Sequence, residues 1–511
     1  MHLRHRIVLV LAVAMISTLA LGMNRSKPNI VWIFSDDHSY QTIGAYGGRL
    51  QSLNPTPNID RLAREGMCFD RCYVGNSICA PSRATLLTGK HSHLNGKYTN
   101  RGPFDHDQPQ FQKVLRKHGY QTVMVGKIHI SGKMQGFDYW EVLPGQGKYN
   151  NPSFVTEEGN TNYQGYVTDI ITDKALDWLQ NKRDEAKPFM LMIHHKAPHR
   201  NWTPAKRHME KYADLHIPEP ANLFDDYRTR TTAAHQQAME VDRHMRMEND
   251  LKVASQAKFQ DGQYARRNQK FAKRQPTGRD LVKWKYQTYM KDFLRCVWAV
   301  DENIGRVLQA LEEQGLADNT VVMYSSDQGF YMGEHGWFDK RFMYEESFRT
   351  PLIVRWPGVT KAQSRNTDLV QNIDWAETFL DIAGASIPGD MQGRSLVPLL
   401  EGNTPADWRK SLYYHYYEYP GAHSVRRHEG VAEKRFKLIR FYGQDVPGGE
   451  EWEFYDLQSD PAEMSNLYGQ SGQASEIQRL KQELQRLKDQ YQVPAIPIAQ
   501  SRPAKRNRAR Q

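Results

Sequence analysis

Cys79 and Arg83, four positions apart, are residues that together could do covalent chemistry on an anion. They begin and end the pentapeptide CAPSR, at the start of a predicted helix. Cysteine can act as a nucleophile, arginine holds an anionic group in a fixed fork of donors, and a helix N-terminus adds positive potential. A structural cysteine in a loop is the plain alternative, because so short a pattern also occurs by chance.

Two pairs of oxygen-bearing side chains could hold a hard cation. Asp36 and Asp37 follow one apolar run, and Asp327 and Gln328 follow another. Adjacent carboxylates at a strand end repel each other unless a cation neutralises them. Ligands that are all oxygen favour Ca²⁺ or Mg²⁺ over zinc. The alternative is a turn in which the aspartates cap a helix.

Four basic side chains could bind an anion or move protons: Lys127, His129, His199 and Lys340. The first two form a Lys-x-His pair behind an apolar run, His199 ends the segment HHKAPH, and Lys340 ends the segment GEHGWFDK. Any one of them alone would more often be a surface charge or a structural histidine. Together with the carboxylates, they favour acid–base chemistry at one pocket.

The longer run CAPSRATLLTGK, from Cys79 to Lys90, resembles the signature of the type I sulfatases, in which the cysteine is oxidised to formylglycine. The resemblance extends from about Pro28 to about Leu467. The stretch Gly336–Pro351 is most similar to the N-acetylglucosamine-6-sulfatase branch of that family. The resemblance to this family implies that a formylglycine-generating enzyme matures the protein and that calcium is its cofactor.

The resemblance also implies a role for each matched residue. The catalytic residues would be Cys79, Arg83, Lys127, His129, His199 and Lys340. The calcium ligands would be Asp36, Asp37, Cys79, Asp327 and Gln328. Gln328 departs from the family, which usually has asparagine or histidine there, although an amide oxygen still suits a hard cation.

A mechanism follows from these implied roles. A hydrated aldehyde at residue 79 has two geminal hydroxyls: one attacks sulfur, and the other lets the sulfated adduct collapse back to the aldehyde. Asp37 would be the base for the attack. His199, with Lys340, would protonate the departing sugar oxygen, and His129 would take the proton of the second hydroxyl.

The elements that must position these residues are short apolar strands, each followed by polar side chains. In open α/β sheets, sites form outside the carboxyl ends of the strands, so these side chains should converge. We expect an alkaline-phosphatase-like α/β fold, with a large mixed sheet between helices and a smaller C-terminal α+β subdomain. The predicted strands are Asn29–Ser35, Gln121–Val125, Phe189–Ile193 and Thr320–Tyr324, and the predicted helices include Asn58–Glu65, Phe111–His118 and Thr168–Asn181.

The sequence changes in character from about Ala362, beyond which aromatic, β-prone runs replace the apolar strands. They predict a small antiparallel sheet followed by an amphipathic helix that contains Ile477 and Leu480. The predicted organisation is a signal peptide (1–22), a catalytic domain (28–400) with a basic insertion (about 239–283), a C-terminal subdomain (401–495) and a basic tail (496–511).

The N-terminus indicates export. Arg4 and Arg6 precede the apolar run Ile7–Leu21, and small residues follow, which is the layout of a secretory signal peptide. The run is short for a membrane span, which needs about 20 apolar residues, although an uncleaved anchor is an alternative. We therefore expect a secreted or periplasmic protein with no stable membrane span.

The charge of the chain narrows its partners. The formal net charge is +10 over 511 residues, which favours nucleic acid, an anionic membrane or an acidic polysaccharide. No nucleic-acid recognition motif is found and the chain is predicted to be exported, so nucleic acid is the poorest of these partners. Four cysteines suit no disulfide framework, although one bridge among Cys68, Cys72 and Cys296 is possible.

The predicted substrate is a sulfated oligosaccharide or polysaccharide, attacked at its end, with 6-O-sulfated N-acetylglucosamine or a similar hexosamine preferred. His423, Arg426 and Arg427 lie in an aromatic segment that suits sugar stacking and anion contact, and they are the predicted substrate-binding residues. Alternatives are an iduronate, galactose or algal-polysaccharide sulfatase, a phosphonate or phosphodiester hydrolase of the same superfamily, or an inactive polysaccharide-binding protein.

Overall fold

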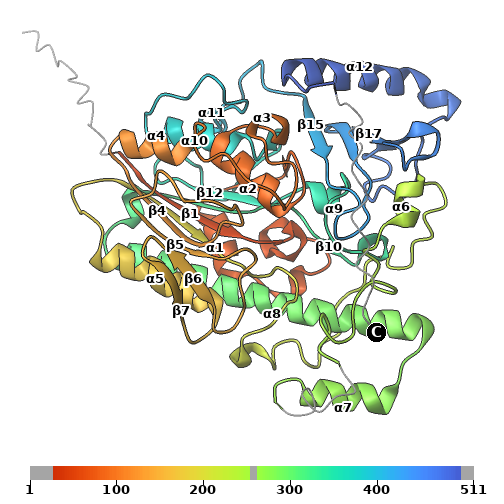
Figure 1. Ribbon diagram of the computed structural model, residues 1–511, viewed down its shortest axis with the longest axis horizontal. Helices are drawn as coiled ribbons and strands as arrows, with labels where there is room; N and C mark the ends of the chain where they lie inside the picture. The colour runs from red at the N-terminus through yellow and green to blue at the C-terminus, as the bar shows by residue number, and fades with distance from the viewer. Residues whose placement is uncertain (1–26, 254–261, 496–511) are drawn as a thin grey trace, which may run out of the picture.

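A ten-stranded mixed sheet forms the centre of the protein in a computed structural model that describes residues 27–253 and 262–495 (Figure 1). The strand order is β13-β2-β12-β9-β1-β8-β4-β5-β6-β7, and β9, β1, β8, β4 and β5 run parallel. Their bounds are β1 Asn29–Ser35, β4 Gln121–Lys127, β5 Tyr139–Leu143, β8 Phe189–His194 and β9 Thr320–Ser326. The outer strands are β2 Met67–Phe69, β6 Ser153–Thr156, β7 Gly159–Asn162, β12 Leu352–Arg355 and β13 Ser364–Asn366.

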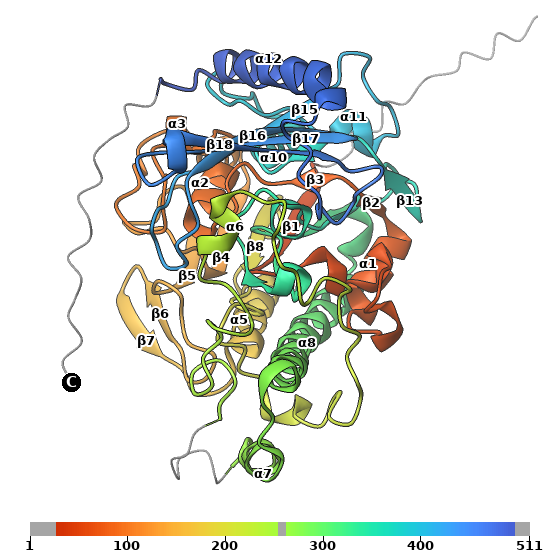
Figure 2. The ribbon, with the colours of Figure 1, turned by 90° about the vertical axis from the view of Figure 1, so that its right-hand side faces the viewer.

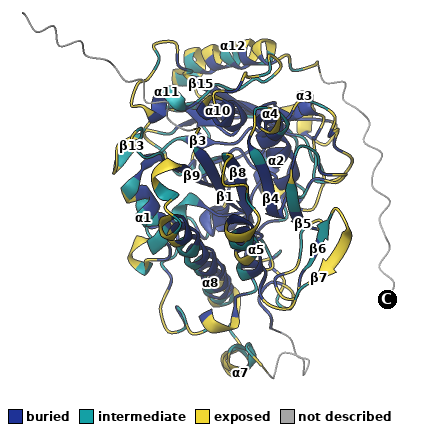
Figure 3. Ribbon diagram, turned by 90° about the vertical axis from the view of Figure 1, so that its left-hand side faces the viewer, coloured by how far each residue is buried: buried dark blue, intermediate teal, exposed yellow. Residues whose placement is uncertain are grey.

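Helices cover both faces of this sheet, which explains why its central strands are apolar throughout. On β1, Trp32 and Phe34 pack into one core cluster, and Val31 and Ile33 pack into another. Figure 3 shows the central strands as buried and β7 as exposed. The first cluster lies against α2 (Cys79–Thr88), α4 (Phe111–Lys117) and α10 (Asp374–Ile382), and the second against α1 (Pro57–Glu65), α5 (Val167–Asn181) and α8 (Gly278–Glu313).

A second, four-stranded antiparallel sheet lies at the C-terminal end, with the order β15-β16-β17-β18 (Figure 2). One face packs against helix α12, whose buried side chains Ile477 and Leu480 share a core with Tyr413 and Phe454. The alkaline-phosphatase-like class with a smaller C-terminal α+β unit is therefore confirmed. The bounds are β15 Ser411–Tyr416, β16 His428–Glu433, β17 Phe436–Tyr442, β18 Glu450–Asp456 and α12 Ala474–Gln490.

The other predictions concern the cysteines, a membrane span and the two ends of the chain. Cys68, Cys72, Cys79 and Cys296 are all buried and unpaired. Across residues 27–253 and 262–495, we find no helix that combines the length and the apolar character of a membrane span. The predicted signal peptide (1–22) and basic tail (496–511) lie outside the described residues.

Candidate active site

Polar side chains converge at the carboxyl ends of adjacent parallel strands. Asp36 and Asp37 follow β1, Lys127 ends β4, and Asp327 follows β9. Because β9, β1, β8 and β4 are neighbours in the sheet, these residues meet in one place, where all four are fully buried. The predicted convergence is thus observed.

Three carboxylates form the centre of this cluster. The backbone N–H of Asp37 donates to Asp327 Oδ1 at 3.0 Å, and Asp37 adopts a left-handed backbone with a φ of 65°. Oxygen atoms of Asp36, Asp37 and Asp327 lie within 4.8 Å of one another, and Asp36, Cys79 and His199 form a second such group. Three buried carboxylates this close require positive charge beside them.

Three cationic side chains supply part of that charge. Lys340 Nζ lies 2.6 and 2.7 Å from the two carboxylate oxygens of Asp37. Arg83 Nε donates to Asp327 Oδ2 at 3.2 Å, and Lys127 Nζ contacts Asp36 Oδ2. The structure therefore brings Arg83, Lys127 and Lys340 together, as predicted from their places in the sequence.

The pKa values of these carboxyls respond to burial and charge in opposite directions. At Asp37, burial raises the pKa, Lys340 opposes that effect, and the nearby Asp327 adds to it. At Asp327, burial also disfavours ionisation, but Arg83, Lys127 and Lys340 outweigh it and lower the pKa. The negative charge of Asp37 is therefore the less well compensated of the two.

Two oxygen atoms of this cluster fit the donor set of a hard cation. Asp36 Oδ1 and Gln328 Oε1 are buried, and neither has a hydrogen-bond partner among the described residues. A buried polar atom without a partner costs about 1–3 kcal/mol, so such atoms call for a ligand. Carboxylate and amide oxygens are the donors that Ca²⁺ prefers, so the residues present fit this ion.

Cys79 is the first residue of α2, directly beside the carboxylates. The next backbone N–H, of Ala80, donates to Asn100 Oδ1 at 2.9 Å, and Ser82 Oγ donates to the Asp327 carbonyl at 2.5 Å. The bond from Ser82 fixes the start of the helix against the residue that follows β9. Burial raises the pKa of the Cys79 thiol to about 12, so the unmodified side chain is a protonated thiol at neutral pH.

Two histidines flank the cluster. His199 Nε2 lies 3.7 Å from Asp37 Oδ2, and its Nδ1 donates to the Arg200 carbonyl at 2.5 Å. His129 has a φ of 54°, and its buried Nδ1 has no hydrogen-bond partner in the described part of the chain. Burial and the nearby Lys127 lower both pKa values, that of His129 to about 2, so both rings are neutral here.

A second polar group beside Lys340 was missed by the sequence reasoning. Arg200 makes a bidentate ion pair with Asp250 at 2.7 and 2.6 Å, and its NH1 lies 3.5 Å from His423 Nε2. The same His423 Nε2 lies 3.2 Å from Asp339 Oδ2, and Arg341 also contacts Asp339. The available signal was adjacency, because Arg200 follows His199 and Asp339 precedes Lys340.

The three predicted substrate-binding residues lie in different surroundings. His423 is close to the Lys340 segment through Asp339, and its Nδ1 donates to the Ala238 carbonyl at 2.7 Å. Arg426 is buried and contacts the Gln236 side chain. Arg427 donates to the carbonyls of Tyr417 and Tyr419 at 3.1 and 3.3 Å. The structure therefore brings His423 to the site, whereas the partners named here for Arg426 and Arg427 are not among the clustered site residues.

An alkaline-phosphatase-like fold with buried carboxylates, a helix-start cysteine and clustered cations defines a hydrolase of anionic esters. Residues 28–385 match the sulfatase family, and residues 333–490 match the C-terminal domain of N-sulphoglucosamine sulphohydrolase. The chain therefore belongs to the sulfatase family and is a sulfuric ester hydrolase.

Particular relatives are more informative than the family. The chain is 48% identical over 492 residues to an N-acetylglucosamine-6-O-sulfatase of Bacteroides thetaiotaomicron, covering 91% of this chain and 87% of the relative. It is 29% identical to human N-acetylglucosamine-6-sulfatase over 418 residues, covering 76% of this chain and 67% of that protein. A solved structure of a protein in complex with its substrate D-glucosamine-2-N,6-O-disulfate is similar, with a TM-score of 0.88 and 46% identity, covering 93% of this chain and 100% of the other.

Proposed function

We propose that this sulfatase removes 6-O-sulfate from N-acetylglucosamine, or from a related glucosamine, at the end of a sulfated glycan. One observation carries the proposal: the chain is 46% identical, over nearly its whole length, to a protein solved with a 6-O-sulfated glucosamine as its substrate. The relative from Bacteroides thetaiotaomicron, 48% identical, is itself an N-acetylglucosamine-6-O-sulfatase.

The proposed nucleophile is residue 79 after oxidation of Cys79 to formylglycine by a formylglycine-generating enzyme. Its hydrated aldehyde would supply one hydroxyl for attack on sulfur and a second for release of the adduct. Two features of the chain support this assignment: the helix start lies against the carboxylates, and the unmodified thiol is protonated. A protonated thiol is a poor nucleophile, so the unmodified residue does not suit the role.

The proposed ligands of a calcium ion are Asp36, Asp37, Asp327, Gln328 and residue 79. When bound, calcium would supply positive charge toward the sulfate oxygens. The chain itself contributes Lys340 and Arg83, which lie against Asp37 and Asp327 and hold these carboxylates in place. Lys127 holds Asp36 in the same way.

Proton transfer is assigned to residues around Asp37. Asp37 is the proposed base for the attacking hydroxyl, and the neutral His129 takes the proton of the second hydroxyl. Lys340 remains protonated, because Asp37 raises its pKa against the effect of burial. His199 donates the proton to the departing oxygen, with the protonated Lys340 beside it as a hydrogen-bond donor, since a bound sulfate favours the charged form of an imidazole 3.7 Å from Asp37.

Recognition of the sugar is assigned to the Asp339–His423 pair. Asp339 Oδ2 accepts, and His423 Nε2 also accepts because Nδ1 donates to the Ala238 carbonyl, so this pair, 3.2 Å apart, can bind the O–H groups of adjacent sugar hydroxyls. Arg200 is held by Asp250 on the same side and adds positive charge. For Arg426 and Arg427, substrate binding stays a prediction. Export through the N-terminal segment, to the periplasm or the medium, is part of the same proposal.

The test is a panel of defined sulfated sugars, with released sulfate measured by ion chromatography. The panel contains glucosamine derivatives sulfated at the 6-O, 3-O or 2-N position, 2-O-sulfated iduronate, and 4-O- and 6-O-sulfated galactosamine. A phosphonate monoester serves as the control for the wider superfamily. We expect release from 6-O-sulfated glucosamines at least about 100-fold faster than from the other sugars. Preference for a 2-O- or 4-O-sulfated sugar would refute the substrate assignment but not the family.

A further inference from the structure

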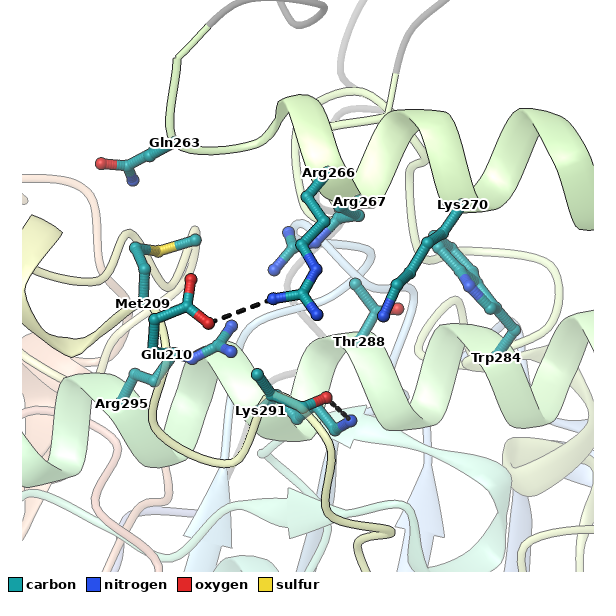
Figure 4. A pocket seen from close by; sticks show the side chains of 11 residues that line it. Met209, Glu210, Gln263, Arg266, Arg267, Lys270, Trp284, Thr288, Lys291 and Arg295 are labelled. Atoms are coloured by element: carbon teal, nitrogen blue, oxygen red, sulfur yellow. Dashed lines mark hydrogen bonds and ion pairs between the residues drawn. The ribbon is translucent and has the colours of Figure 1, made fainter.

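A basic hollow lies between helix α7 (Ala265–Arg274) and helix α8, outside the candidate active site. Its volume is about 200 Å³. Figure 1 shows α7 as a separate helix beyond α8, at the edge of the molecule. The side chains that line it, most of them labelled in Figure 4, are Met209, Glu210, Ala213, Gln263, Arg266, Arg267, Lys270, Trp284, Thr288, Lys291 and Arg295.

Positive charge dominates this hollow. Arg266 and Lys270 extend from α7 toward Lys291 on α8, and Glu210 is the one acidic side chain among the described residues that line the hollow (Figure 4). The buried Asp292 lies behind the lining and pairs with Arg267 at 2.5 Å and with Arg295 at 3.0 Å. Asp292 therefore fixes two guanidinium groups in position without facing the hollow as a lining residue.

The acids at the rim bind their partners weakly. Glu210 lies 3.2 Å from Arg266, and Asp214 lies 3.8 Å from Arg266 and 4.0 Å from Lys270. Both acidic side chains are 79% exposed. Exposed pairs of this kind contribute about 0–1 kcal/mol, so an incoming anion can replace them at little cost.

Lys291 shows that positive charge in the hollow is in excess. Its half-buried amine donates to the Ala213 carbonyl, a neutral partner, at 2.8 Å. Burial and the charges of Arg295, Lys270 and Arg267 lower its pKa to about 8, against the opposing effect of Asp214. A ligand anion in the hollow would relieve this repulsion.

The hollow also has an aromatic wall. Trp284 on α8 packs against Phe271 on α7, with ring centroids 4.6 Å apart, and it lines the hollow beside Lys270. An aromatic face beside cations suits a sugar ring that carries anionic groups. Exposed Lys273, Arg274 and Arg279 continue the positive charge along the two helices.

We infer that the α7–α8 hollow is a second binding site, which holds an internal sulfate-bearing unit of a glycan chain while the active site works on a chain end. The inference rests on the proposed function for the identity of the anion. The hollow contains the buried Arg295 and a tryptophan wall, and these features favour a sulfated sugar over nucleic acid. Binding of nucleic acid is one outcome of the test below.

The experiment measures binding of a heparin-derived octasaccharide by calorimetry at fixed salt. The test variant is Lys270→Gln/Lys291→Gln. The matched control is Lys117→Gln/Lys361→Gln, which removes two exposed lysines away from the hollow. We expect the test variant to bind about 10-fold more weakly or worse, on the scale of a lost charge-assisted hydrogen bond. The control should change binding less than twofold, and both variants should keep the wild-type kcat/KM for a sulfated monosaccharide.

Two outcomes would overturn the inference. Equal loss of affinity in both variants would mean that only overall charge matters. The hollow would be a general polyanion site if a single-stranded DNA of the same charge bound as tightly as the octasaccharide and the Lys270→Gln/Lys291→Gln variant lost that binding. A failure of the proposed function can be distinguished from these outcomes. In that case no sulfate is released from the monosaccharide, while binding of the octasaccharide can still be measured.

Discussion

Gln328 donates from Nε2 to Asp37 Oδ1 at 2.5 Å, and its own Oε1 is buried with no hydrogen-bond partner among residues 27–253 and 262–495. The amide nitrogen is therefore held by Asp37, and the amide oxygen is available to bind a cation. In the sulfatases that the sequence resembles, asparagine or histidine is usual at this position. The side chain of Gln328 still reaches Asp37 through Nε2.

Replacement of Gln328 tests whether that oxygen is a metal ligand. We expect Gln328→Leu to weaken calcium binding by at least about 10-fold, because the substitution removes both the amide oxygen that would bind calcium and the hydrogen bond to Asp37. The calcium affinity of Gln328→Asn should lie between those of the wild type and the leucine variant. The measurement is calorimetric titration of the chelator-treated protein with CaCl₂. Unchanged affinity in the leucine variant would remove Gln328 from the ligand set.

Removal of the metal should abolish turnover. Chelation is expected to lower kcat/KM by about 100-fold or more, because bound calcium would supply positive charge to the sulfate oxygens. Calcium should restore the rate better than zinc, since the donors are oxygen atoms. Asp327→Ala should behave like the chelated protein, and Asp318→Ala, an exposed acid before β9, should keep the calcium response. Full activity after chelation would contradict the calcium assignment.

Lys340 is the cation in direct contact with Asp37. Lys340→Met is expected to lower kcat by about 100- to 1,000-fold, the scale of one removed donor to developing charge. The variant keeps most of the apolar stem, so its melting temperature should change little. A variant that lost stability and activity together would indicate a structural role, and a near-wild-type kcat would exclude Lys340 from the chemistry.

His423 tests sugar recognition apart from chemistry. His423→Ala should lower kcat/KM for 6-O-sulfated N-acetylglucosamine by about 10-fold or more, because a sugar hydroxyl loses a partner. The rate with 4-nitrophenyl sulfate, which has no sugar, should stay within about twofold of the wild type. Equal losses on both substrates would contradict the assignment of His423 to the sugar.

Glu377 should make the stability of the fold depend on pH. It is buried in α10 and accepts from the Gly393 N–H at 2.6 Å, and burial followed by the nearby Asp374 raises its pKa from 4.5 to about 8. The folded state thus keeps a proton that the unfolded chain loses. The free energy of unfolding should fall between pH 4.5 and 8, by at most about 1.4 kcal/mol per pH unit.

The matched variant is Glu377→Gln, which resembles the protonated side chain at every pH. Urea unfolding at pH 5 and pH 8 should show a smaller decrease for this variant than for the wild type. An identical decrease in both proteins would show that Glu377 is not the group responsible.

The sequence predicted the parallel core well, because local pattern and tertiary environment agree there. The apolar run at β1 is buried on both faces, so its composition alone identifies a central strand. The polar residues behind β1, β4 and β9 then had to meet, since neighbouring parallel strands end on the same edge of the sheet.

Other parts of the structure depend on contacts that no local pattern records. The strand β16, with the sequence HEGVAE, was not predicted, because it is held by β15 and β17 on either side. Its Gly430 leaves room for Met343 and for the Leu438 carbonyl, which a Cβ would meet at 2.5 and 2.6 Å. The same limit applies to Asp339 and His423, which are far apart in sequence and adjacent in space.

The central claim is that residue 79 hydrolyses sulfate esters as formylglycine, and mass spectrometry of its peptide tests this most directly. Preparations made with different amounts of the maturing enzyme are compared by specific activity and by the fraction of the peptide that is about 18 Da lighter than the cysteine form. We predict that specific activity rises in proportion to that fraction and vanishes with unmodified Cys79. Full activity in a preparation whose residue 79 is entirely cysteine would contradict the account.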